Sequence, residues 1–133
     1  MEAGRELDAL VAEKVMGLTR HNESYVTESI GKVLRFVWRD GCGDCVYSGD
    51  MFLPRYSTNI AAAWEVVNHL MCLGYDNKWF FQLHYDNVEL WDASFYKEST
   101  SDGGGPEVWS TAGAPALAIC LAALKAVSQE GQR

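Results

Sequence analysis

Apolar residues recur at helical spacing in three segments of the chain. In the first segment they are separated by charged residues at intervals of three and four, which predicts an amphipathic helix of about four turns. Its apolar face is formed by Leu7, Leu10, Val11, Val15 and Leu18. The same spacing predicts a second helix from Ile60 up to Gly74, with Gly74 as its stop and Ser57 or Thr58 as its N-cap.

The third helical segment, Ala114 to Val127, is apolar around nearly its whole circumference. A helix of this composition must be buried in protein, because it is too short to cross a membrane. Pro115 suits the first turn of this helix, and Thr111 or Gly113 suits its N-terminal cap. We therefore expect this segment to form part of the core.

A second kind of pattern, alternation between apolar and polar positions, predicts a β-strand from Ile30 to Arg39. Asp40-Gly41 then begins a turn, and Cys45 to Ser48 is expected to return as a short paired strand. This region therefore predicts a small antiparallel unit between the first two helices.

Two aromatic-rich runs, Lys78 to Tyr85 and Val88 to Tyr96, are separated by Asp86-Asn87, a pair that can adopt the positive φ values of a tight turn. They predict a β-hairpin, whose two faces are explained by helices on both sides or, alternatively, by a partner. The polar stretch Lys97 to Gly105 predicts a loop. This order of elements predicts an α+β fold in which helices cover a mainly antiparallel sheet.

The composition limits the number of domains and the class of partner. The chain has 133 residues, 48 % of them hydrophobic, so we expect a single domain over residues 1–133. A net charge of −7 argues against binding to nucleic acid or to an anionic membrane, because both require lysine and arginine. No apolar run reaches the roughly eighteen residues of a membrane span, and Met1 to Leu10 is charged rather than signal-like. Five tryptophans favour a homo-oligomer.

Four cysteines are present, and we expect thiols, because a reducing compartment seldom keeps structural disulfides. Cys72 and Cys120 lie in apolar helical stretches and are expected in the core. Cys42 and Cys45 form a CxxC sequence in a glycine-rich turn, which could supply half a zinc site or a redox pair. Since no second CxxC or HxxxH sequence completes four ligands, we expect a plain turn, with no metal and no cofactor.

Three stretches carry a family resemblance: Arg5–Gly17 (RELDALVAEKVMG), Leu53–Val67 (LPRYSTNIAAAWEVV) and Ala114–Leu124 (APALAICLAAL). Together they resemble the phage ABA sandwich family of small phage and prophage proteins. The resemblance implies a three-layer helix–sheet–helix sandwich with a mainly antiparallel sheet, and it implies no reaction. Asn59 departs from the Asp that usually follows Ser-Thr in the family, and Gly113 from the Thr that commonly precedes Ala-Pro.

The starts of the second and third helices form the candidate site. If the fold brings them together, backbone amides, hydroxyls, one guanidinium and two aromatic rings would suit a phosphate with a base or sugar. The candidate residues are Arg55, Tyr56, Ser57, Thr58, Trp109, Ser110, Thr111 and Gly113. The alternative is that they only cap and cover helix ends.

Catalysis is not indicated, because His21, His69 and His84 lie in three different elements and no GxSxG, HExxH or P-loop sequence occurs. We expect a non-catalytic phage accessory protein that counters host defence by sequestering a nucleotide-derived immune signal in the host cytoplasm. The alternatives are an inhibitor that binds a host defence enzyme, and a virion or assembly component. The expected partner is a nucleotide-like small molecule or a host protein, rather than nucleic acid or a membrane.

Overall fold

The computed structural model describes residues 2–29, 31–72, 79–86, 89–97 and 106–130. Within these ranges the strands form two antiparallel sheets, ordered β1-β2-β3 and β4-β5-β6. The elements in chain order are α1 (Arg5–Lys14), β1 (Thr19–Thr27), β2 (Gly31–Arg39), β3 (Cys45–Tyr47), the 3-10 helix η1 (Asp50–Phe52), α2 (Ile60–Met71), β4 (Phe80–Tyr85), β5 (Trp91–Tyr96), β6 (Glu107–Ala112) and α3 (Pro115–Glu130).

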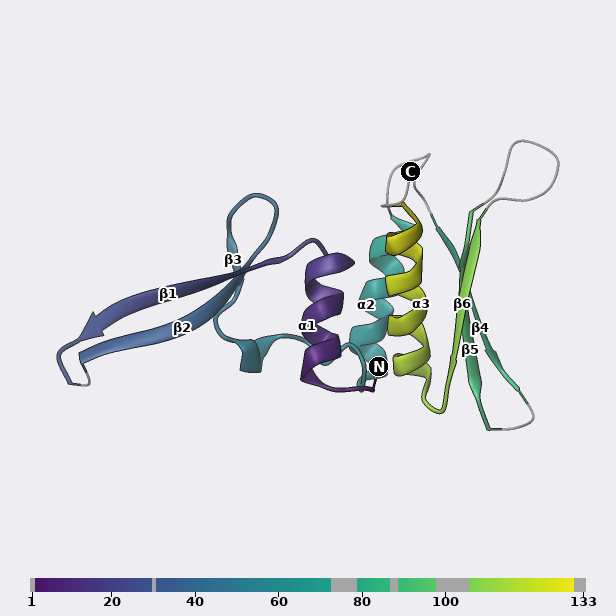
Figure 1. The fold of residues 1–133 in the computed structure, drawn as a ribbon, viewed down its shortest axis with the longest axis horizontal. Coiled ribbons are helices and arrows are strands. Elements are labelled where there is room, and N and C mark those ends of the chain that lie inside the picture. The colour runs from purple at the N-terminus through teal and green to yellow at the C-terminus, as the bar shows by residue number, and fades with distance from the viewer. Residues whose placement is uncertain (1, 30, 73–78, 87–88, 98–105, 131–133) are drawn as a thin grey trace.

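The helices stack in layers on the β4–β6 sheet. α3 packs on β5 and β6, and α1 and α2 both pack on α3 (Figure 1). The β1–β3 sheet extends away from the opposite side of the helices (Figure 1). The predicted α+β class, with helices packed on mainly antiparallel sheet, is confirmed. The resemblance implied the order helix–sheet–helix, whereas the described helices lie between the two sheets and cover the β4–β6 sheet on one face only (Figure 1).

The core lies between the helices and the inner face of the β4–β6 sheet. α3 reaches both because its buried residues are mostly small, so that neighbouring backbones approach it closely on several sides. This explains the apolar circumference seen in the sequence, and the predicted burial of α3 is confirmed. The buried residues of α3 are Ala116, Ala118, Ile119, Cys120, Ala122, Ala123 and Ala126.

The helix ends differ from two of the predicted caps. Asn59 caps α2, since its side chain accepts from the Ala62 amide at 3.2 Å, so the prediction of Ser57 or Thr58 is wrong. Thr111 does not cap α3, because it lies in β6. Pro115 is the first residue of α3, as predicted. The predicted stop at Gly74 lies outside the described residues.

The strands include two that the sequence pattern did not reveal, β1 and β6. The predicted hairpin is confirmed, with Phe81 opposite Phe95. The prediction of a tight two-residue turn at Asp86-Asn87 is wrong. Tyr85 pairs with Trp91, so the two strands are connected by residues 86–90. Most of the predicted loop at Lys97 to Gly105 lies outside the described residues.

The cysteines are free thiols. Cys120 is buried, as predicted, whereas the prediction of a buried Cys72 is wrong. Cys72 is exposed because α2 ends at Met71, so the thiol lies beyond Leu70, the last buried residue of that helix. None of the described helices is long and apolar enough to cross a membrane.

Candidate functional site

The β4–β6 sheet turns one face to the helices and the other away from them. On the inner face, Phe81, Ala93, Phe95 and Val108 belong to or pack against the core. The alternate residues form what we call the outer face, which the registers arrange in three rows across the strands. The rows are His84–Asp92–Thr111, Gln82–Ser94–Trp109 and Phe80–Tyr96–Glu107.

Trp109 is the large exposed aromatic residue of the outer face, with 61 % of its surface accessible. It lies in β6, at the edge of the sheet, beside Ser94 of β5. Its backbone carbonyl accepts a hydrogen bond from Lys125 Nζ of α3 at 2.8 Å. The outer face therefore carries an open indole ring, and the Lys125 ammonium group reaches the backbone of the same residue from the α3 side of the sheet.

The first row of the outer face is polar. Thr111 Oγ1 donates to Asp92 Oδ1 at 2.5 Å, and His84 lies opposite Asp92 in the register. In a nucleophilic triad the histidine stands between the hydroxyl and the carboxylate, whereas here the carboxylate stands in the middle. This row is therefore suited to hydrogen bonding with a ligand rather than to activating Thr111.

The third row adds two aromatic rings. Phe80 and Tyr96 stack with ring centroids 5.6 Å apart and an interplanar angle of 21°. Ser94 of β5 pairs with Trp109 of β6, and Tyr96 lies two residues further along β5 on the same face. Tyr96 is therefore the diagonal neighbour of Trp109. The outer face thus offers aromatic surfaces together with amide, hydroxyl and carboxylate groups.

Of the four site residues predicted at the start of α2, two are buried and two are exposed. Tyr56 and Ser57 are each 1 % exposed, so their side chains belong to the core, and burial raises the pKa of Tyr56 above its ordinary value. Ser57 is bonded to Asp8 of α1. Only Arg55 and Thr58 of this group are exposed.

The two halves of the predicted site meet only in part. The starts of α2 and α3 lie at the same end of the helical layer (Figure 1), and Gly113 lies in the connection before α3. In β6, however, Ser110 is buried on the inner face, whereas Trp109 and Thr111 project from the outer face. The chemistry predicted for one pocket is thus divided between two surfaces.

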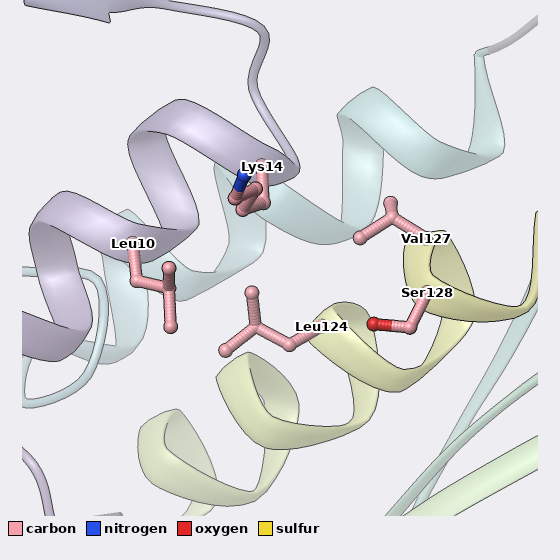
Figure 2. Close-up of a pocket in the computed structure, with 5 residues that line it drawn as sticks. All are labelled: Leu10, Lys14, Leu124, Val127 and Ser128. Atoms are coloured by element: carbon pink, nitrogen blue, oxygen red, sulfur yellow. The ribbon is translucent and has the colours of Figure 1, made fainter. Parts of the chain in front are cut away.

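A hollow between α1 and α3 was not predicted from the sequence. Figure 2 shows Leu10 and Lys14 of α1 facing Leu124, Val127 and Ser128 of α3. The hollow has a volume of about 410 Å³ and is open to solvent. Its mostly aliphatic lining offers few hydrogen-bonding groups, so the outer face is the richer site.

Metal ligands are not clustered in the described part of one chain. No group of three or more His, Cys, Asp or Glu side chains there could hold a metal ion. The outer face and the hollow are therefore evaluated as sites for organic ligands or protein partners.

The comparisons with known proteins identify a family. The family model described as the phage ABA sandwich domain matches residues 9–124 of the chain. No curated protein and no solved structure matches the chain.

Proposed function

Because this chain belongs to the phage ABA sandwich domain family, we propose that it is a non-catalytic phage accessory protein that acts by binding. In this proposal it counters host defence by sequestering a nucleotide-derived immune signal in the host cytoplasm. The binding surface is the outer face of the β4–β6 sheet, where α1, α2 and α3 do not cover the sheet (Figure 1).

The exposed ring of Trp109 is the single observation that carries the proposal. A tryptophan that is 61 % exposed costs free energy in water, yet it stands beside Ser94 on a largely polar sheet surface rather than within an apolar patch. Stacking of a nucleobase on such a ring contributes about 1–3 kcal/mol. The ring is therefore well placed to hold the base of a ligand.

The neighbours of Trp109 suit the remaining parts of a nucleotide. Gln82 and Ser94, in the same row, offer hydrogen bonds to base edges or ribose hydroxyls. Lys125 Nζ reaches the Trp109 carbonyl oxygen at 2.8 Å from the α3 side of the edge strand β6, and it provides a positive charge for a phosphate that extends past this edge. A chain with a net charge of −7 can still bind an anion where one cation is placed locally.

Sequestration requires affinity and abundance rather than turnover. A bound signal molecule is removed from the free pool according to its dissociation constant, and no bond of the ligand needs to be broken. A small domain with a rigid sheet surface meets this requirement.

The proposal is tested by measuring the Tm of the purified chain with a panel of mononucleotides, cyclic oligonucleotides and ADP-ribose derivatives. A true ligand at about 100 times its Kd should raise the Tm by roughly 5 °C or more. Mass spectrometry of the denatured protein should identify the same compound if it copurifies.

Trp109→Ala should weaken binding of that compound by about tenfold or more, because the stacking energy is lost. Phe52→Ala is the matched control, since Phe52 is a similarly exposed aromatic residue (63 %) in η1, outside the sheet. No Tm change with any compound at millimolar concentration, or equal loss in both variants, would contradict the outer face as the binding site.

An apolar stripe on α2 favours a second function, inhibition of a host defence enzyme by direct binding. Ile60, Trp64 and Met71 follow one another at intervals of four and seven residues and are 41 %, 42 % and 36 % exposed. Such a stripe is typical of a helix that contacts another protein.

The two functions are separated by one pair of variants. Met71→Glu should abolish a protein interaction through α2 and leave nucleotide binding unchanged, whereas Trp109→Ala should do the reverse. Retention of a host protein by the wild type and by Trp109→Ala, but not by Met71→Glu, would support the inhibitor and contradict the sequestering function.

A further inference from the structure

The turn between β2 and β3 presents two free thiols. Cys42 and Cys45 are both exposed, and the CxxC spacing allows two thiolates to bind the same metal ion. Cys72 is also exposed but has no second cysteine near it in the sequence. Cys42 and Cys45 can therefore chelate one metal ion together, which Cys72 cannot do.

The backbone of this turn is held by Asp40. Its Oδ1 accepts from the amides of Cys42 at 2.9 Å and of Asp44 at 3.0 Å. The Asp40 amide donates to the Asp44 carbonyl at 3.0 Å, and Gly43 has a φ of 87°, which glycine adopts readily. Little conformational entropy would be lost when the two thiolates bind an ion, because the turn is already closed.

A cation lies over the same turn. Arg39 Nη1 donates to the Gly43 carbonyl at 2.9 Å, and the guanidinium also pairs with Glu23. The guanidinium therefore stabilises negative charge at the turn.

The two thiols complete only half of a structural zinc site, which has four ligands. Within the described residues of one chain, no cluster of three or more ligands supplies the rest. The turn lies at an end of the β1–β3 sheet and is not covered by the helices (Figure 1), so the same turn of a second copy can approach it.

We propose that Zn²⁺ joins two copies of this chain through Cys42 and Cys45 of each copy. Four thiols lose four protons to solvent, and four sulfur–zinc bonds form without any change in oxidation state. The arrangement is a two-fold interface in which the same surface is used twice. This zinc-bridged pair is independent of the ligand bound at the outer face.

The experiment uses the full chain, reduced with a phosphine and freed of metal with a chelator. Zinc should bind at one ion per two chains, and the mass measured by light scattering should double relative to the metal-free protein. Co²⁺ should give the intense visible absorption and the sulfur-to-metal charge transfer of a tetrahedral four-thiolate site.

Cys42→Ser and Cys45→Ser should each abolish the mass change and the four-thiolate spectrum, with unchanged circular dichroism. Cys72→Ser is the matched control and should behave as the wild type. Absence of zinc binding, one ion per chain with no change in mass, or equal binding by Cys42→Ser would overturn the proposal.

Discussion

The Asp8 carboxylate accepts two hydrogen bonds from Ser57, one from its amide at 2.8 Å and one from its hydroxyl at 2.7 Å. Both residues are 1 % exposed, and Arg5 Nη1 lies 3.2 Å from the second carboxylate oxygen. These bonds join α1 to the segment that enters α2. The helical layer is therefore held by a buried polar contact as well as by apolar packing.

Asp8→Ala should lower the free energy of unfolding by about 2 kcal/mol, because the Ser57 amide then remains buried without its acceptor and the Ser57 hydroxyl keeps only the Gly4 carbonyl at 3.3 Å. Urea denaturation at pH 7 measures this as a lower midpoint at unchanged slope. Glu6→Ala, at an exposed position of the same helix, should leave the midpoint unchanged. A wild-type midpoint for Asp8→Ala would show that the contact contributes little.

The contact between η1 and the β1–β3 sheet should weaken in acid, because it depends on the ionised carboxylate of Asp50. This carboxylate accepts from Arg20 of β1 and, at 2.9 Å, from Trp38 Nε1 of β2. Hydrogen bonding from Arg20 is the main cause that lowers the pKa of Asp50 below its ordinary value of 3.8. Since the folded pKa is lower, the stabilisation is complete above the unfolded value and is lost as pH falls through the folded pKa.

Asp50→Asn should therefore destabilise the protein by about 1 kcal/mol at pH 6, because the pair is partly exposed, and by much less near pH 2. Urea denaturation at the two pH values gives the difference. Glu13→Gln, at an exposed position of α1, serves as the charge control. A destabilisation that is the same at both pH values would rule out the linkage.

The N-cap of α2 is tested by comparing two adjacent residues. Asn59→Ala should lower the free energy of unfolding by about 1 kcal/mol, because the Ala62 amide loses its acceptor, whereas Asn59→Asp should retain most of the stability. Thr58→Ala, at an exposed position, should change stability by less than about 0.5 kcal/mol. Thermal or urea denaturation measures the stability of the three variants. A larger loss of stability in Thr58→Ala than in Asn59→Ala would assign the cap to Thr58.

The helices were predictable because burial on one side imposes a period of three to four residues, as in α1 and α2. β6 was missed because its buried alternate residues, Val108, Ser110 and Ala112, are mostly small or polar, while the exposed set includes Trp109. The usual contrast between apolar inner and polar outer positions is therefore reversed at the centre of this strand.

β1 was missed for a different reason. It is a largely polar strand that pairs with β2 outside the helical layer, so its sequence shows no apolar face.

The candidate site was only partly predictable, because the residue types in a sequence do not show on which face of a strand each side chain lies. Trp109 and Thr111 were selected as neighbours of a helix start, and pairing in β6 places them on the outer face.

Lys125 provides the last test of that face. For any nucleotide that binds the wild type, Lys125→Gln should weaken binding by about fivefold and reduce its dependence on salt, because a charge near Trp109 is lost. The corresponding nucleoside, which has no phosphate, should bind both proteins equally. Isothermal titration at two salt concentrations measures these effects. Lys14→Gln is the matched control, since Lys14 lines the hollow between α1 and α3. Weaker binding in Lys14→Gln, with Lys125→Gln unaffected, would place the ligand in the hollow and not on the sheet.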